Sequence, residues 1–116
     1  MNKAKLTING KSYDAYVSMY VLSEVCDVYD LDGIAEVGVN IQTKPFKWLP
    51  VVMYEGICYD YLKRGEVMEL TKWDVFEWLD EKTLEDKEVV NYIKVMTDSL
   101  NKHIPQIEGD EGAKKK

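Results

Sequence analysis

The first residues of the chain alternate between apolar and polar side chains, which predicts a β-hairpin. Residues 5–8 and 11–16 follow a period of two, as strands with one buried face do. Between them lies Asn9-Gly10, which suits a type I′ turn because both central positions of that turn need positive φ. A lone hairpin is barely stable in water, so we expect one face to pack against helices.

Apolar residues at spacings of three and four predict helices after the hairpin. We expect four of them, near residues 18–30, 49–64, 72–81 and 84–104. Ser18 and Thr71 suit the N-cap positions of the first and third helices, and Thr83 with Asp86 suits that of the last. Segment 49–64 is apolar on most sides, which predicts the centre of the core.

The inward faces of two helices follow from the same spacings. In the first helix the expected core positions are Val21, Leu22, Val25, Val28 and Tyr29. In the last helix they are Val89, Ile93, Met96, Leu100 and Ile104. We expect the first helix to end at residues 30–33, with Gly33 in the left-handed conformation that closes a helix.

Glycine and proline set the expected boundaries in the middle of the chain. Residues 34–44 fit one helical turn as well as a short strand, and we interpret them as a connection. Pro45 suits the first turn of a helix, but Pro50 would kink a helix that began there, so the main helix is expected to start near Leu49. Gly56 costs that helix about 1 kcal/mol relative to Ala, which indicates a close contact at this point.

The helix expected at residues 72–81 has an unusually wide apolar arc. Val75, Phe76 and Leu79 form one face, with Trp73 on one side and Trp78 on the other. A single core covers a stripe of roughly 100°, so another surface should take part of this arc. The candidate protein-binding residues are Trp48, Trp73, Phe76, Trp78 and Leu79. We expect Trp73 to be the more exposed of the two tryptophans in this helix.

Composition is consistent with one compact domain, expected over residues 1–105. The chain has 116 residues, of which 46% are hydrophobic and 31% charged, and its formal charge is -6. That charge argues against nucleic-acid binding, which needs a basic surface. No apolar run approaches the ~20 residues of a membrane span, and no signal peptide is evident, so we expect a cytoplasmic protein without membrane contact. Residues 106–116 are polar and contain glycine, which predicts a flexible tail.

Chemistry-bearing motifs are few. Cys26 and Cys58 lie in apolar helical patterns, and the single histidine, His103, lies at an expected helix end. These residues do not have the spacing of a zinc site, and no Gly-rich phosphate loop or nucleophile elbow is present. We therefore expect a non-enzymatic protein with no metal and no cofactor.

The order of these segments resembles the tail assembly chaperones of long-tailed bacteriophages that infect Gram-positive bacteria. The resemblance covers about residues 5–82. It lies in the hairpin Leu6 to Tyr13, the Ser18 helix ending in Tyr29-Asp30-Leu31, the segment Gly38-Val39-Asn40, the apolar run Trp48 to Gly56, and Thr71 to Asp80 with its Trp78-Leu79-Asp80 end. The family has no invariant chemical motif, so the match depends on order and spacing.

The resemblance implies a protein of the host cytoplasm that binds the tape measure protein, keeps it soluble and helps to recruit tail tube subunits. An acidic domain with an over-wide apolar helix is compatible with this function, since such a surface can cover helices of a client. A small acidic adaptor that forms a homo-oligomer, without a tape measure client, would show the same wide arc. Both alternatives stay open at the level of sequence.

Overall fold

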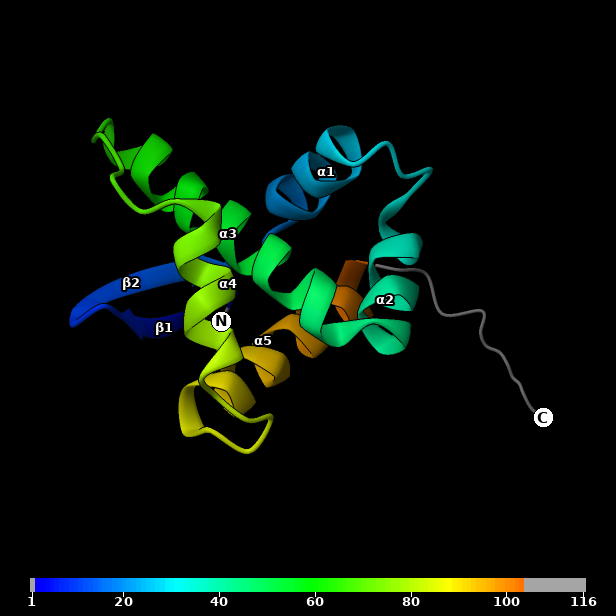
Figure 1. Cartoon of the computed structure of the whole chain (residues 1–116). Helices are drawn as coiled ribbons and strands as arrows, with labels where there is room; N and C mark the ends of the chain where they lie inside the picture. Colours follow the sequence, from blue (N-terminus) through cyan, green and yellow to red (C-terminus); the bar gives the residue numbers. More distant parts are fainter. Residues whose placement is uncertain (1, 104–116) are drawn as a thin grey trace.

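The computed structural model describes residues 2–103 and confirms a mainly α fold with an N-terminal β-hairpin (Figure 1). The elements in chain order are β1 (Lys3–Ile8), β2 (Lys11–Tyr16), α1 (Met19–Val28), α2 (Ile34–Thr43), α3 (Pro45–Arg64), α4 (Lys72–Asp80) and α5 (Lys87–His103). The described residues form one compact body with five helices, one more than expected. The predicted flexible tail at 106–116 lies outside the described residues.

The hairpin forms as predicted. β1 and β2 pair antiparallel, with Ile8 opposite Lys11 across the turn. Asn9 and Gly10 have φ angles of 54° and 79°, as the two-residue turn requires. Every second side chain faces the helices, and these buried positions are Ala4, Leu6, Ile8, Tyr13 and Ala15.

Helix α1 starts as predicted but ends differently. The Ser18 hydroxyl accepts from the backbone N–H of Val21 at 3.2 Å, which confirms the N-cap. Beyond the helix, Asp30 takes the left-handed conformation with φ 56°, whereas Gly33 is extended and precedes α2. Val28, expected in the core, is 58% exposed because the inward face ends at Val25.

The expectation that residues 34–44 form a connection is wrong, since they form helix α2. Val37 and Ile41, one turn apart, are buried against the rest of the molecule. Their burial outweighs the poor helix propensity of Gly38 and of the β-branched residues, because tertiary packing supplies most of the stability of short helices.

Helix α3 starts at Pro45, and not near Leu49 as expected, and continues through Pro50. Proline at position 50 removes one hydrogen bond of the first turns. Trp48, Leu49 and the valines that follow are buried on either side of it, and this burial offsets the loss. Gly65, with φ 67°, closes the helix.

Helix α5 begins at Lys87, later than expected. Asp86 caps it, since its carboxylate accepts from the N–H groups of Glu88 and Val89 at 2.9 and 3.2 Å. Thr83 instead accepts from Glu85 in the preceding turn. The buried positions are Val89, Tyr92, Met96, Ser99 and Leu100, so the expected stripe is confirmed in part; Ile93 is partly buried and Ile104 lies outside the described residues.

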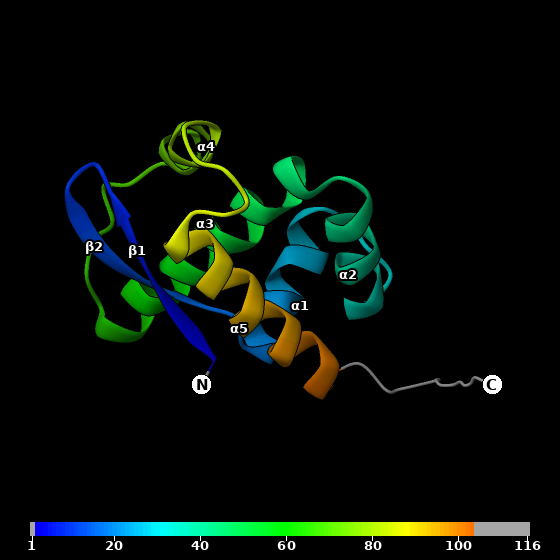
Figure 2. The same ribbon diagram turned by 90° about the horizontal axis from the view of Figure 1, so that it is seen from below.

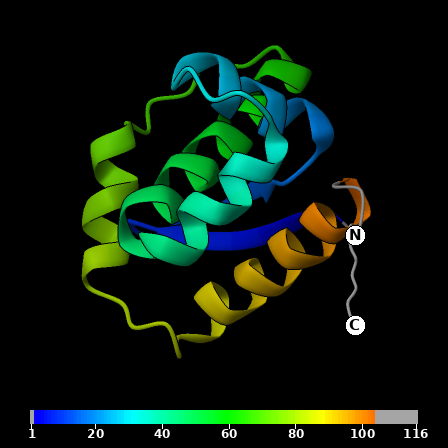
Figure 3. The ribbon, with the colours of Figure 1, turned by 90° about the vertical axis from the view of Figure 1, so that its right-hand side faces the viewer.

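The hairpin lies between α3 and α5, with α3 packed along β2 and α5 along β1 (Figures 2 and 3). Gly56 of α3 faces the backbone of Tyr16, so the close contact indicated by this glycine is confirmed. Helix α4 packs on α3. No helix among the described residues is both long and apolar enough to span a membrane.

Candidate protein-binding surface

The start of α4 is fixed by a reciprocal pair of hydrogen bonds. The Thr71 hydroxyl accepts from the N–H of Asp74 at 3.2 Å, and the Asp74 carboxylate accepts from the N–H of Thr71 at 2.9 Å. With this start, Val75, Trp78 and Leu79 face the core. Trp73 is directed outward and is 68% exposed, which confirms the predicted difference between the two tryptophans.

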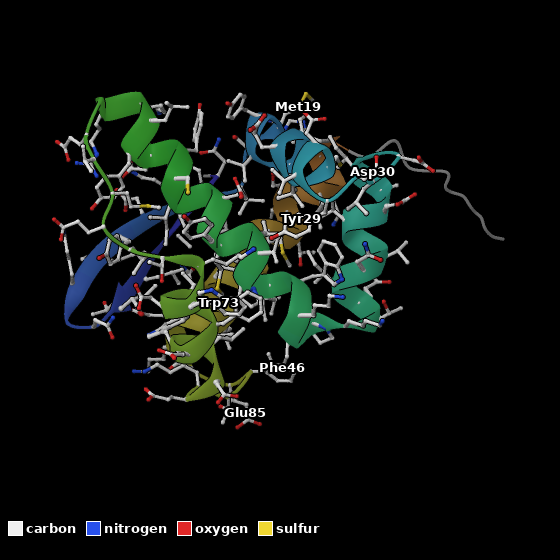
Figure 4. The ribbon with its side chains drawn as sticks, turned by 45° about the horizontal axis from the view of Figure 1, so that its top comes forward. Met19, Tyr29, Asp30, Phe46, Trp73 and Glu85 are labelled. Carbon is white, nitrogen blue, oxygen red and sulfur yellow. The ribbon has the colours of Figure 1, made fainter. Side chains whose placement is uncertain are left out.

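Trp73 belongs to a continuous aromatic surface on α4 and α3. Its ring centre lies 5.8 Å from that of Phe76, which is half-buried. Phe76 and Phe46, the second residue of α3, line a shallow hollow of about 270 Å³ with Leu79 at one wall. Figure 4 shows Trp73 and Phe46 on the same side of the molecule. We call the surface formed by Phe46, Trp73, Phe76, Glu77, Leu79 and Asp80 the aromatic groove.

Acidic side chains border the aromatic groove. Glu77 and Asp80 line the hollow, and both are exposed. Within residues 2–103 neither carboxylate forms an ion pair. The groove is therefore apolar in the middle and negative along one side, which favours a partner with basic groups beside an apolar anchor.

Three of the five candidate residues do not present an open surface. Trp48 is 9% exposed and its ring meets that of Tyr29 edge-on, with the ring centres 5.4 Å apart. Trp78 is 6% exposed and packs in the core, and its indole Nε1 has no hydrogen-bond partner among the described residues. Leu79 is 2% exposed and contributes only a wall of the hollow. The wide arc of α4 is thus mostly covered by the core, and only Trp73 and Phe76 remain accessible.

Phe46 is the part of the surface that the sequence did not indicate. With the main helix expected to start near Leu49, Phe46 lay before it, yet the residue is 56% exposed in the first turn of α3. A single aromatic residue beside a proline gives no signal of exposure by itself.

The cysteines show no sign of an activated thiol. Cys26 and Cys58 are free and half-buried. Burial raises the pKa of both thiols above their ordinary value, which keeps them protonated at neutral pH. Burial also raises the pKa of the nearby Tyr54 hydroxyl to about 12. Among the described residues, no group of three or more His, Cys, Asp or Glu side chains is placed to hold a metal ion.

Comparison of the chain with protein-family models, with curated proteins and with solved structures gave no match.

Proposed function

We propose that this protein is a tail assembly chaperone of a long-tailed bacteriophage with a Gram-positive host. In this proposal the aromatic groove binds helices of the tape measure protein in the host cytoplasm and helps to recruit tail tube subunits, without catalysing a reaction. The sequence resemblance over residues 5–82 suggests the class of protein. The observation that carries the proposal is the exposure of Trp73 beside Phe76 and Phe46.

Exposed aromatic side chains that gather in one patch are typical of surfaces that bind a partner. Trp73 is 68% exposed and Phe46 is 56% exposed. Phe46 lines the hollow, and Trp73 contacts the ring of Phe76, which also lines it. Aromatic residues that project beside a pocket are the usual anchors of protein interfaces. A helix laid into such a groove would place one large apolar residue in the hollow.

The acidic side of the groove supports a client with basic residues. Glu77 and Asp80 would meet Lys or Arg side chains one turn away from the apolar anchor of the client helix. Such exposed charge pairs contribute little affinity but raise the association rate, and salt screens them. Association should therefore weaken as the salt concentration rises.

The test is co-expression with a tape measure protein and a tail tube protein of one phage, followed by isolation of a soluble complex. Trp73→Ser should lower the affinity by about 2 kcal/mol, roughly 30-fold, because the anchor is lost. Its thermal stability should change by less than about 0.5 kcal/mol, because an exposed side chain contributes little to folding. Val67→Ser is the matched control, since Val67 is 88% exposed but lies outside the groove.

Two outcomes would contradict this function. If Trp73→Ser binds the client as tightly as wild type, the aromatic groove is not the binding site. A wild-type protein that binds no tape measure protein but dissociates from an oligomer to a monomer on Trp73→Ser would instead identify a homo-oligomeric adaptor.

A further inference from the structure

The hairpin has two outer edges, and hydrogen bonds identify which backbone groups they present. The N–H of Thr7 in β1 donates to Glu88 Oε1 of α5 at 2.8 Å, so the backbone of Thr7 points away from β2. Thr7 lies opposite Ser12 in the register. Because the backbone of Thr7 points away from β2, Thr7 and Ser12 form a non-hydrogen-bonded pair of the antiparallel ladder. The N–H and C=O of Ser12 therefore point away from β1. The same holds for Asp14, two residues further along β2.

The fold covers each edge in part, at Thr7 on β1 and at Tyr16 on β2. Glu88 also accepts from the Thr7 hydroxyl at 2.8 Å, so its carboxylate occupies the edge of β1. At the other end of the hairpin, α3 covers the backbone of Tyr16 at Gly56. Between these points, the described part of the chain supplies no hydrogen bond from another element to the backbone of Ser12 or Asp14. An unpaired strand edge of this kind can template the pairing of another chain.

A polar hollow lies beside this open edge. It has a volume of about 480 Å³, within the range of ligand-binding sites. Besides Ser12, the residues that matter here are Lys3, Asp14 and Tyr16 of the hairpin and Asp60, Lys63 and Arg64 of α3. We call this hollow the edge basin. In Figure 1 the last turns of α3 and the turn of the hairpin point apart on this side of the molecule.

The charges of the edge basin differ from those of the whole protein. Lys3 pairs with Asp14 at 3.5 Å, and Arg64 pairs with Asp60 at 3.0 Å and also with Glu66. Lys63 has no ion pair within the described residues, and its ammonium group lies 4.5 Å from the centre of the Tyr16 ring. Three cations and two carboxylates line the hollow, and Glu66, which pairs with Arg64 beside it, makes the local charges equal in a chain of formal charge -6. Lys63 is therefore the cation of the edge basin that has no carboxylate partner among the described residues.

We propose that the edge basin binds an extended, acidic segment of a partner protein, which adds to β2 as a third strand. Its backbone would exchange hydrogen bonds with Ser12 and Asp14, and a carboxylate of alternate residues would meet Lys63. Strand addition obtains its affinity from main-chain hydrogen bonds and its specificity from the side chains that flank the edge. This site lies on β2 and α3 and does not depend on the aromatic groove or on its client.

The probe is a short synthetic peptide that alternates threonine and glutamate, compared with a peptide in which lysine replaces glutamate. Amide NMR signals and hydrogen exchange report on Ser12 and Asp14 directly. The glutamate peptide should shift both signals and slow the exchange of both amides, and the lysine peptide should do neither. Lys63→Glu should weaken binding of the glutamate peptide about tenfold, because one attraction becomes a repulsion. Lys94→Glu, on the exposed side of α5, is the control and should bind as wild type.

A proline in the edge tests the backbone part of the proposal. Ser12→Pro removes an N–H that the hairpin does not use, so the fold should persist while peptide binding is lost. Lys5→Pro makes the equivalent change on the β1 edge and should leave binding intact. Equal shifts with both peptides, or binding that survives Ser12→Pro in a folded protein, would overturn the proposal. Slow exchange of the two amides in the absence of peptide would also overturn the proposal. If this protection grows with protein concentration, a second copy of the chain occupies the edge. If it is the same at all concentrations, a segment of the same chain occupies it.

Discussion

Gly56 is expected to be the least replaceable small residue of the fold, because α3 and β2 touch there through their backbones. A Cβ atom at position 56 would lie 2.2 Å from the carbonyl oxygen of Tyr16 and 2.8 Å from its nitrogen. Both atoms belong to the main chain of a strand, so no side chain can rotate away. Gly56→Ala must therefore displace either the helix or the end of the hairpin.

Two effects of opposite sign decide the size of the change. Alanine favours the helix by about 1 kcal/mol relative to glycine. Overpacking typically costs 1 to 3 kcal/mol and sometimes more. A gap of 2.2 Å must open by roughly 1 Å to reach an ordinary contact. That shift also disturbs the adjoining Val17, whose N–H donates to Asn2 O at 2.6 Å and whose carbonyl accepts from the Ser99 hydroxyl. We expect a net loss of about 2 kcal/mol or more, or roughly 8 °C in melting temperature.

Urea unfolding followed by circular dichroism measures this loss. Gly33→Ala is the matched control, because a Cβ there meets no atom within 4 Å and the residue is extended. Its cost should stay below about 1 kcal/mol, the usual range for a helix N-cap position. If Gly56→Ala is as stable as wild type or more stable, the propensity gain prevails and the close approach of α3 to β2 is refuted.

Three further changes test other parts of the structure. Tyr92→Phe should raise stability by about 1 kcal/mol, since it removes a buried hydroxyl with no partner among the described residues; a loss in thermal melting would reveal a hydrogen bond there. Burial, and then the charge of Glu24, raise the pKa of Glu55 above its ordinary 4.5. The contribution of Glu55 to folding stability is therefore fully present below pH 4.5 and is lost as pH rises through the raised pKa. Glu55→Gln should therefore be more stable than wild type at neutral pH. If the difference in unfolding free energy between the two proteins, measured in urea, is the same from about pH 4 to about pH 7, this effect is excluded. Glu88→Ala should cost about 1 kcal/mol and speed hydrogen exchange at Thr7, whereas unchanged exchange would show that the carboxylate does not protect the β1 edge.

Features that depend on a few neighbouring residues could be predicted from the sequence. The turn at Asn9-Gly10, the cap at Ser18 and the capping box of Thr71 and Asp74 all act within four residues, so their signals are local. The exposure of Trp73 followed from the same source. Once the cap fixes the start of α4, the angle of 100° per residue decides which side chains face outward.

Features that depend on distant packing could not be predicted in this way. α2 exists because Val37 and Ile41 are buried where it packs on α1, α3 and α5, and its local sequence fits a strand equally well. α3 runs through Pro50 because the flanking apolar residues are buried, which the proline itself does not reveal. The edge basin likewise arises only where the end of α3 meets β2.

The two errors about the candidate surface, at Trp48 and Phe46, have one cause. The sequence predicts the start of the main helix near residue 49, so both residues fell before the expected helix and their directions could not be inferred. In the structure the helix begins at Pro45, which occupies its first turn, and α2 packs against α3. Residues two apart on a helix point about 200° apart. When Trp48 turns inward to the ring of Tyr29, Phe46 must therefore turn outward beside Phe76. The Phe46 wall of the aromatic groove is thus set by the packing of Trp48 on Tyr29 at the end of α1, while its Trp73 side is set locally by the cap of α4.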